Sequence, residues 1–420
     1  MMYSHATMAT IQRGSDQRPG ATRGEGSGAP VSAGLDSNAT VGMARSLPME
    51  GDGVASVPAR RSSRGGPATT VSVAVVGATG YAGGEVVRLL ARHPHVRIVG
   101  LVGRNRDHEP IGAIHPHLAW TGLEIDATLP DSDAVFLALP HGAAAEMVPE
   151  IARAGRTIVD LGPDFRLHQA ADYPRWYRFD HPAPELLARA VYGLPELHRA
   201  ELRALRDSPM AIVGAPGCYP TATVLALAPL ARAGLIGDLV VDAKSGVSGA
   251  GRDAKPDLMF GEVNESVKAY GLGGHRHVAE VEQELAALGA EAPGGPAANP
   301  GAALVDFLPH LIPMTRGILS TCHVRPTRPV TQAELDALYA VAYAGEPFVR
   351  VVADPPATKH VLGSNECRVH VRLDQRTGRI IVIGVIDNLV KGAAGQAIQA
   401  FNLVHGLQET AGLEQLPLVP

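Results

Sequence analysis

Cysteine is scarce in this chain of 420 residues, which has only three: Cys218, Cys322 and Cys367. An odd, sparse set argues against a disulfide framework, and no two of the three have the spacing of metal ligands. We therefore expect a cytoplasmic protein that holds no metal. The chain also lacks an apolar run long enough to cross a membrane. Its net charge of −5 gives no sign of a nucleic-acid-binding surface.

Hydrophobic residues make up 45% of the sequence, which is enough for the cores of two or three domains. Residues 1–68 are different, because they are rich in Gly, Ser, Ala, Arg and Pro and have no sustained period. This composition predicts a disordered N-terminal extension. It has no apolar segment like that of a signal peptide, and scattered acids weaken a transit-peptide interpretation. Met8, Met43 and Met49 are alternative initiators, so translation could also begin later than residue 1.

A strand, a glycine turn and a helix follow one another directly after this extension. Residues 71–76 are apolar and β-branched, as in a buried parallel strand, and residues 85–92 have helical character. A lone glycine pattern is often only a turn, but these flanks make it a nucleotide site. The glycines let backbone N–H groups approach a pyrophosphate at the helix N-terminus. The predicted cofactor contacts are Gly77, Thr79, Gly80, Tyr81 and Gly83.

The second strand, residues 96–102, ends without the Asp or Glu that an NAD site would carry. Arg104 stands there instead and suits a 2′-phosphate, so NADP is preferred; a solvated loop charge is the alternative. Further strands at 133–139 and 157–161 enclose a helix at 143–154, which predicts a doubly wound parallel sheet. The first of these closes on Pro140, another predicted cofactor contact.

Cys218 lies where the strand 211–213 turns into the helix 224–230. The free N–H groups and the dipole of the helix start both favour a thiolate, which is the nucleophilic form. Gly217 permits a sharp turn there. The alternative is a small buried cysteine that only packs, which is how we interpret Cys322 and Cys367.

Two groups of residues suit an anion. Arg166 ends a strand and is placed to hold a phosphate or carboxylate, or else to pair with Asp164. Residues 245–251, which include Ser245 and Gly246, are small, offer backbone donors and lead to Arg252. A flexible connector is the alternative for this loop.

His275 and His277 come at the start of a predicted helix, and Glu280 follows three residues after His277 on the same face. A carboxylate in this position can orient an imidazole and stabilise its protonated form, as a general acid/base requires. The pair could also bind a metal, but no third ligand is nearby in the sequence, which disfavours a metal.

The last third of the chain is rich in strands, at 303–312, 318–324, 368–373 and 380–386, with a helix at 334–344. This predicts an α+β domain whose mixed or antiparallel sheet is suited to pair subunits. A final helix reaches about residue 407 and is expected to return to the nucleotide half. The predicted domains are an NADP-binding domain, 69–218 and 388–420, and a catalytic and oligomerisation domain, 219–387.

Over residues 70–420 the chain resembles the N-acetyl-gamma-glutamyl-phosphate reductases, which are related to aspartate-semialdehyde dehydrogenase. The resemblance rests on GATGYAGGE (77–85), HPHL (115–118), ALPHG (138–142), DFRL (164–167), GCYPTA (217–222), SGVSGAGR (245–252), HRH (275–277) and DNLVKGAAGQAIQ (387–399). Two positions depart from the family's usual pattern: Ala215 stands where Asn is common, and Ala279 where Pro is common.

The resemblance implies NADPH-dependent reduction of N-acetylglutamyl 5-phosphate to the 5-semialdehyde and phosphate, in arginine biosynthesis, by a homodimer or homotetramer. The family's nucleophile falls on Cys218 and its histidine base on the pair at 275–277. We favour His277, because Glu280 can orient it, with His275 as a ligand or alternative base. Asn388 falls at the nicotinamide end. The alternatives are a reductase of amino-adipyl or aspartyl phosphate, and a non-catalytic NADP-binding protein with Cys218 as a redox sensor.

Overall fold

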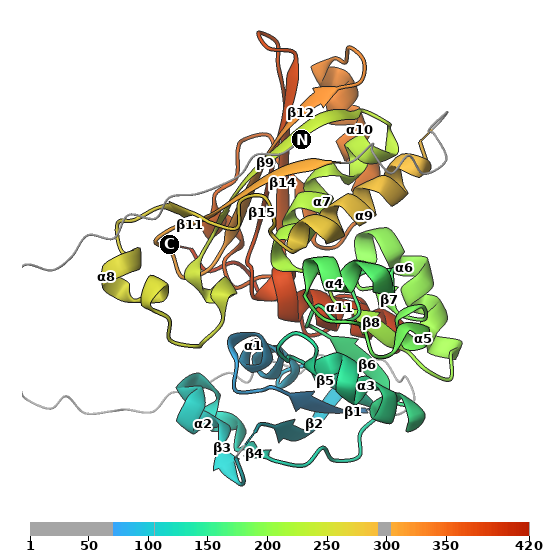
Figure 1. Cartoon of the computed structure of the whole chain (residues 1–420), viewed down its shortest axis with the longest axis vertical. Helices are drawn as coiled ribbons and strands as arrows, with labels where there is room; N and C mark the ends of the chain where they lie inside the picture. Colours follow the sequence, from blue (N-terminus) through green and yellow to red (C-terminus); the bar gives the residue numbers. More distant parts are fainter. Residues whose placement is uncertain (1–69, 105, 293–303, 420) are drawn as a thin grey trace, which may run out of the picture. The chain divides into compact units, whose positions relative to one another are not determined.

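The computed structural model describes residues 70–104, 106–292 and 304–419 (Figure 1). The expected N-terminal extension, residues 1–68, lies outside these ranges. Within them, the strands form two sheets, one of eight strands and one of seven. None of the helices in these ranges is long and apolar enough to cross a bilayer.

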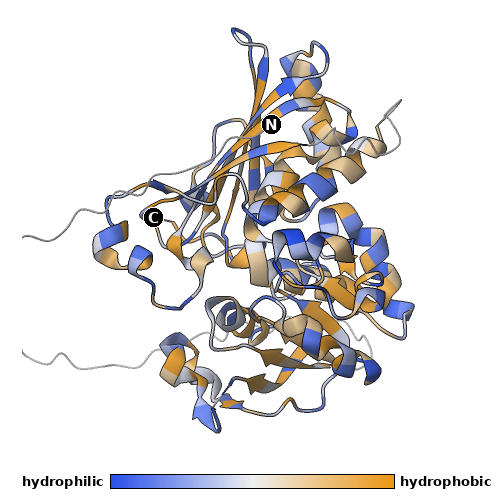
Figure 2. Ribbon diagram, viewed as in Figure 1, coloured by the Kyte–Doolittle hydropathy of each residue, from blue (hydrophilic) through white to orange (hydrophobic). Residues whose placement is uncertain are grey.

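The eight-stranded sheet is the doubly wound parallel sheet that the first half of the sequence predicts. Its order is β3-β4-β2-β1-β5-β6-β8-β7, and only the pair β3 and β4 is antiparallel. The central strands β1 and β5 are mainly apolar, as strands with both faces covered must be, and both are coloured in the hydrophobic range in Figure 2. The strands are β1 (Val71–Val76), β2 (Val96–Val102), β3 (Glu109–Pro110), β4 (Glu124–Asp126), β5 (Ala134–Leu137), β6 (Thr157–Asp160), β7 (Val191–Tyr192) and β8 (Ile212–Gly214).

Helices flank this sheet, and one of them comes from the far end of the chain. Helix α11 contacts α1, α6, β6 and β8, which confirms that the last helix returns to the nucleotide half. The segment 168–190 contains the short helices α4 and α5, each of which has a proline in its first turn, where proline is favoured. The helices are α1 (Tyr81–Leu90), α2 (Ile111–Ile114), α3 (Ala143–Arg153), α4 (Tyr173–Trp176), α5 (Pro184–Leu187), α6 (Pro195–Ala204) and α11 (Gly395–Val404).

The seven-stranded sheet is mixed, in the order β10-β11-β9-β12-β15-β14-β13. Strands β9, β12, β15 and β14 are antiparallel neighbours, whereas β11 runs parallel to β9 and β13 parallel to β14. Val241, Cys322 and Val382 stand side by side on three neighbouring strands and are fully buried. Cys367, in β14, is fully buried too, so both cysteines pack as predicted. The strands are β9 (Ile236–Ser245), β10 (Lys268–Ala269), β11 (Val305–Leu311), β12 (Ile318–Pro326), β13 (Val349–Val351), β14 (Cys367–Asp374) and β15 (Arg379–Ile386).

Helix α7 (Cys218–Arg232) packs on this sheet and against two further helices. It contacts β9, β12, β14 and β15, and also α9 (His277–Ala290) and α10 (Gln332–Ala342). It is therefore buried almost along its whole length, which explains its Ala- and Leu-rich composition on every face. The fold thus fixes the start of α7, where Cys218 stands, against a rigid core.

Candidate active site

The glycine turn between β1 and α1 is shaped for close backbone approach. Gly77 has a φ of +82°, and a Cβ on it would stand 2.2 Å from the carbonyl oxygen of Ala138. A Cβ on Gly83 would stand 2.2 Å from the carbonyl oxygen of Gly77. Gly80 is the N-cap of α1, and no side chain caps this helix. The first N–H groups of α1 are therefore left for a phosphate group.

The other predicted cofactor residues stand at the same edge of the sheet. Thr79 lies within the turn, and Tyr81 begins α1 with a partly exposed ring. Arg104 and Pro140 are exposed just after β2 and β5. Arg252, predicted to hold substrate, donates from Nη1 to the carbonyl oxygen of Thr79 at 3.2 Å. The structure thus places Arg252 beside the glycine turn, where it can contribute to cofactor binding.

Cys218 is the first residue of α7, directly after the extended N-cap Gly217. The strand, turn and helix around it are those predicted from the sequence. Gly392, in the π-helical turn η7 (Val390–Ala394), stands behind it, and a Cβ on Gly392 would lie 2.8 Å from the Cβ of Cys218. The side chain of Cys218 is half-buried, so it is enclosed without being sealed off.

The thiol of Cys218 is protonated at neutral pH. Burial raises its pKa to about 11, although the charge of Arg166 and the backbone N–H groups of Cys218 and Tyr219 oppose the rise. The helix-terminus effect predicted from the sequence has the expected sign, but desolvation outweighs it. Cys218 therefore needs a proton acceptor before it can attack a substrate.

His277 begins α9 and is placed to be that acceptor. A Cβ on Gly217 would stand 2.6 Å from the Nε2 of His277, so the imidazole lies against the residue before Cys218. Burial, followed by the nearby His275, holds the pKa of His277 well below its usual value, so the ring is neutral. Its Nδ1 is buried and has no hydrogen-bond partner in the described part of the chain.

His275 is a packing residue by comparison. Its Nδ1 accepts a hydrogen bond from the backbone N–H of His277 at 3.2 Å. Its ring contacts those of Tyr219, Tyr270 and Phe307, at centroid distances of 5.6, 5.7 and 5.4 Å. Burial lowers the pKa of His275 to about 4. Of the two histidines left open by the sequence, the geometry favours His277 as the acid/base.

Glu280 does not orient His277, contrary to the expectation from their spacing. Its Oε2 accepts from the backbone N–H of Gly217 at 2.9 Å and from the hydroxyl of Tyr192 at 3.0 Å. Its Oε1 accepts from Arg166 at 3.2 Å. A fully buried carboxylate requires an opposite charge and several donors, which a neutral imidazole does not supply. Glu280 instead anchors the turn that carries the nucleophile.

Arg166 is bonded through all three of its nitrogen atoms. Its Nε donates to the carbonyl of Ala215 and its Nη2 to that of Leu161, both at 2.7 Å, while Nη1 pairs with Glu280. Asp164, the alternative partner, binds the backbone at the start of α3 instead. Of the five N–H donors of a guanidinium, two are left for a ligand. Arg166 is thus mainly a brace for the strand ends around the turn.

The backbone N–H groups at the start of the loop 245–251 donate to carbonyl groups elsewhere in the protein, contrary to the predicted role of the loop as an anion-binding site. The N–H of Gly246 donates to the carbonyl of Gly317 at 3.0 Å, and the next two N–H groups are also used. The Oγ of Ser245 donates to the adjacent carbonyl. Asn388 ties the loop down, because its Nδ2 donates to Ser248 Oγ at 2.9 Å and its Oδ1 accepts from the N–H of Gly317 at 2.7 Å. The loop continues the pairing of β9 and β12, which consumes these groups.

Arg276 is the site residue that sequence reasoning missed. It is the N-cap of α9, and Tyr177, Arg166 and Cys218 are among the charged or titratable groups close enough to act on it. Arg276 is exposed as a residue, although partial desolvation lowers its pKa, and an arginine stays charged at neutral pH. Unlike Arg166, it makes no ion pair with any described residue. A cation at a helix N-terminus is unfavourable, and this signal could have identified it.

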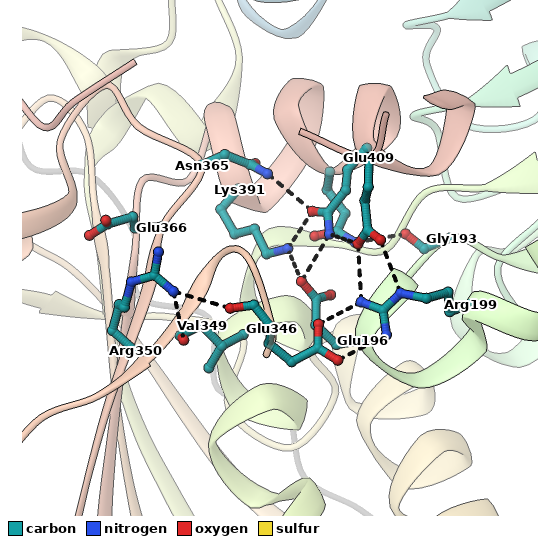
Figure 3. Close-up of polar contacts among 12 residues, drawn as sticks. Gly193, Glu196, Arg199, Glu346, Val349, Arg350, Asn365, Glu366, Lys391 and Glu409 are labelled. Carbon is teal, nitrogen blue, oxygen red and sulfur yellow. Dashed lines mark hydrogen bonds and ion pairs between the residues drawn. The ribbon is translucent and has the colours of Figure 1, made fainter. Parts of the chain in front are cut away.

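A buried polar network joins η7 to α6 and α11 (Figure 3). Lys391 is fully buried and donates to Glu196 of α6 at 2.5 Å and to Oε1 of Gln399 at 2.7 Å. Gln399 also bonds to Asn365 and Glu409. Burial alone would raise the pKa of Glu196, but Lys391 brings it below the usual value, so Glu196 is a carboxylate at neutral pH. The network therefore fixes the turn whose Gly392 backs Cys218.

Two family models match the chain, one for each sheet. The model described as "Semialdehyde dehydrogenase, NAD binding domain" matches residues 72–205. The model described as "Semialdehyde dehydrogenase, dimerisation domain" matches residues 218–388.

Solved structures show the same two-domain α/β fold. Aspartate semialdehyde dehydrogenase with NADP from Candida albicans matches with a TM-score of 0.60 and 17% identity, over 80% of this chain and 98% of that one. A probable aspartate-semialdehyde dehydrogenase from Pseudomonas aeruginosa matches with a TM-score of 0.58 and 20% identity, over the same shares.

Curated relatives are much more similar in sequence. The N-acetyl-gamma-glutamyl-phosphate reductase of Heliobacterium modesticaldum is 49% identical over 362 residues, which are 83% of this chain and 100% of the relative. That of Moorella thermoacetica is 43% identical over 360 residues, with the same coverage. Identity at this level along the full length of the relatives shows that the chain belongs to the N-acetyl-gamma-glutamyl-phosphate reductase family.

Proposed function

We propose that this chain reduces N-acetylglutamyl 5-phosphate with NADPH, giving N-acetylglutamate 5-semialdehyde and phosphate through a thioester on Cys218. The observation that carries the proposal is the placement of a half-buried cysteine beside a neutral histidine and an unpaired arginine. The substrate is inferred from relatives that bear the reductase name, one of which is 49% identical to this chain. The reaction places the protein in arginine biosynthesis.

The residues of the glycine turn fit a dinucleotide. Gly77 and Gly83 leave no room for a side chain, and the start of α1 is uncapped. Arg252 donates a hydrogen bond to the carbonyl of Thr79 in the glycine turn, and a guanidinium at this place is suited to bind a pyrophosphate. The exposed Arg104 suits a 2′-phosphate, so the cofactor is NADP. When bound, NADPH supplies the hydride that reduces the acyl carbon.

The nucleophile is activated by proton transfer. The thiol of Cys218 passes its proton to Nε2 of His277, and the sulfur attacks the acyl carbon. The bond from that carbon to the phosphate oxygen breaks, and phosphate leaves with the shared electron pair. Reduction of the thioester gives a hemithioacetal on Cys218. Its carbon–sulfur bond then breaks to release the aldehyde, and Cys218 recovers a proton from His277. A neutral imidazole suits the first of these steps, because only the neutral ring accepts a proton.

The substrate's charges call for cations that no carboxylate already occupies. We assign the anionic group nearest the thiol to Arg276, with the two unused N–H donors of Arg166 in support. Ser245 and Gly246, which the sequence predicts to bind substrate, act instead by fixing the shape of the loop. Glu280 acts through Gly217, since it holds the turn that aims Cys218.

We propose an NADP-binding domain made of residues 69–218 and 388–420, and a catalytic and oligomerisation domain of residues 219–387. Two copies pair through the second domain, as a homodimer or within a homotetramer. In support, Thr321 and Ile383 stand opposite each other on β12 and β15, on the sheet face away from α7, and are only half-buried in one chain. The three free thiols agree with a cytoplasmic location.

The reverse reaction tests the proposal. N-acetylglutamate 5-semialdehyde and inorganic phosphate are mixed with NADP, and its reduction is followed by absorbance. We expect activity that depends on phosphate, loss of activity in Cys218→Ala, and a much slower rate with aspartate semialdehyde. No reduction by the wild-type protein, or a full rate in Cys218→Ala, would overturn the proposal.

A further inference from the structure

Residues 252–272, which we call the arm, leave the seven-stranded sheet and return to it as β10 (Figure 1). The arm includes the short helix α8 (Phe260–Val263) and carries four exposed apolar side chains. Phe260 is 81% exposed and Met259 62%, and Val267 and Leu272 are exposed to a similar degree. A single exposed apolar residue is ordinary, but four within one segment mark a contact surface.

The arm is a built element, held at several points. Lys268 and Asp257 form an ion pair across it at 2.9 Å. Strand β10 pairs with β11 at the edge of the seven-stranded sheet. Glu265 has a φ of +59°, a conformation that is strained for a residue with a Cβ. These contacts leave the four apolar side chains directed at solvent, which is unfavourable unless something covers them.

Both ends of the arm lie in the active site. At one end, Arg252 bonds to the carbonyl of Thr79 in the glycine turn. At the other, the hydroxyl of Tyr270 donates to that of Tyr219 at 3.0 Å, one residue after Cys218. Whatever covers the arm is therefore in a position to fix both the cofactor turn and the helix start that carries the nucleophile.

The occupant is a second copy of this chain. The arm lies inside residues 218–388, which match a dimerisation domain, and its strand β10 extends the sheet of that domain. Charges of both signs are interspersed with the apolar residues: Lys255 and Asp257 precede Met259, and Glu265 and Lys268 stand on either side of Val267. A two-fold contact requires such self-complementarity, and contacts between identical chains have apolar centres.

We propose that the arm docks on a second copy of the chain through Met259, Phe260, Val267 and Leu272, and that this contact holds both ends of the active site in place. The proposal rests on the pairing of copies stated under the proposed function. It adds the surface that makes the contact and the route by which pairing supports activity.

The test uses the full chain and compares the wild type with Phe260→Asp and, separately, Leu272→Asp. Mass photometry and sedimentation velocity over a dilution series give the dissociation constant between copies. Burying a charge in an apolar contact is costly, so we expect this constant to rise at least about tenfold in each variant. Activity per chain should fall at concentrations where the variants are monomeric and recover at high concentration.

Leu416→Asp is the matched control, because Leu416 is also 81% exposed but lies outside the arm. Circular dichroism verifies that each variant is folded. A wild-type chain that is monomeric at micromolar concentration overturns the proposal. So do arm variants whose dissociation constant stays within threefold of the control, which includes the case in which the arm covers substrate or another part of its own chain. These outcomes leave the reductase assay intact, because a monomer that reduces NADP in the reverse reaction still has the proposed activity.

Discussion

Gly392 and Cys218 are in direct contact, although 174 positions separate them in the sequence (392 − 218). A Cβ on Gly392 would stand 2.8 Å from the Cβ and 3.2 Å from the Cα of Cys218. No side chain fits at position 392 while Cys218 keeps its place. The buried pair of Lys391 and Glu196 fixes the turn from the other side. The nucleophile is therefore positioned by a segment from the far end of the chain.

Gly392→Ala should lower kcat and leave the KM for NADPH nearly unchanged. The added methyl group must displace Cys218 or the turn behind it, and a shift of about 1 Å at a reacting atom can cost about 100-fold in rate. Steady-state kinetics measure both constants. Gly289→Ala is the control, because a Cβ at Gly289 in α9 meets nothing within 4 Å. Equal kcat values in the two variants would contradict the positioning role.

Arg276→Gln should raise the KM for the acyl phosphate. Losing a charge-assisted hydrogen bond costs about 1.5–3 kcal/mol, so we expect an increase of roughly 10- to 100-fold. Binding of NADPH, measured by fluorescence titration, should change little. Arg328→Gln serves as the control, since Arg328 is paired with Glu334 at the surface. A KM that does not change in Arg276→Gln would exclude the proposed contact with substrate.

Arg104→Ala should weaken the binding of NADPH without affecting the binding of NADH, because only NADPH carries a 2′-phosphate. The loss of one charge-assisted contact predicts a KM for NADPH that is higher by about tenfold or more. Arg106→Ala is the control, as Arg106 is already paired with Glu109. Equal effects of Arg104→Ala on the two cofactors would refute the assignment.

Glu85→Gln should destabilise the protein in a pH-dependent manner. Glu85 is buried in α1 and bonds to Arg88 and Arg316. Burial alone would raise its pKa, but the two arginines lower it to about 2, from 4.5. A lowered pKa stabilises the fold above the unfolded-state pKa, and the benefit is lost as the pH falls toward 2. Urea unfolding at pH 7 should show a loss of about 3 kcal/mol.

The comparison with the wild type should be repeated down to the lowest pH at which both proteins fold. The difference between them should shrink below about pH 5, because the wild-type carboxylate then begins to lose its advantage. A penalty that stays constant from pH 7 to pH 3 would show that the loss comes from packing.

The sequence predicts the fold well because its strongest signals are local. Apolar strands, the glycine turn and the strand-to-helix turn at Cys218 all depend on neighbouring residues, and all are present in the structure. Short helices such as α4 and α5 have too few residues for a periodic pattern, so the sequence does not reveal them. Strand pairing such as β11 beside β9 depends on contacts far apart in the chain, which spacing alone does not reveal.

The site is less predictable, because the partners and the burial of its residues depend on contacts between elements that are far apart in the sequence. Glu280 has helical spacing from His277, yet its partners are Arg166 and Gly217, from other elements. Desolvation sets the pKa of Cys218 and depends on burial that no sequence pattern displays. The backbone N–H of Gly246 looked free because its acceptor, the carbonyl of Gly317, lies far along the chain in the loop before β12.

Release of phosphate without NADPH tests the central claim, that Cys218 takes the acyl group before reduction. The protein is mixed with N-acetylglutamyl 5-phosphate alone, and phosphate is measured by rapid quench. We predict a burst of about one phosphate per active site, with an acyl adduct on Cys218 in the intact mass, and neither in Cys218→Ala. The absence of a burst in the wild type, or an equal burst in Cys218→Ala, would contradict the account.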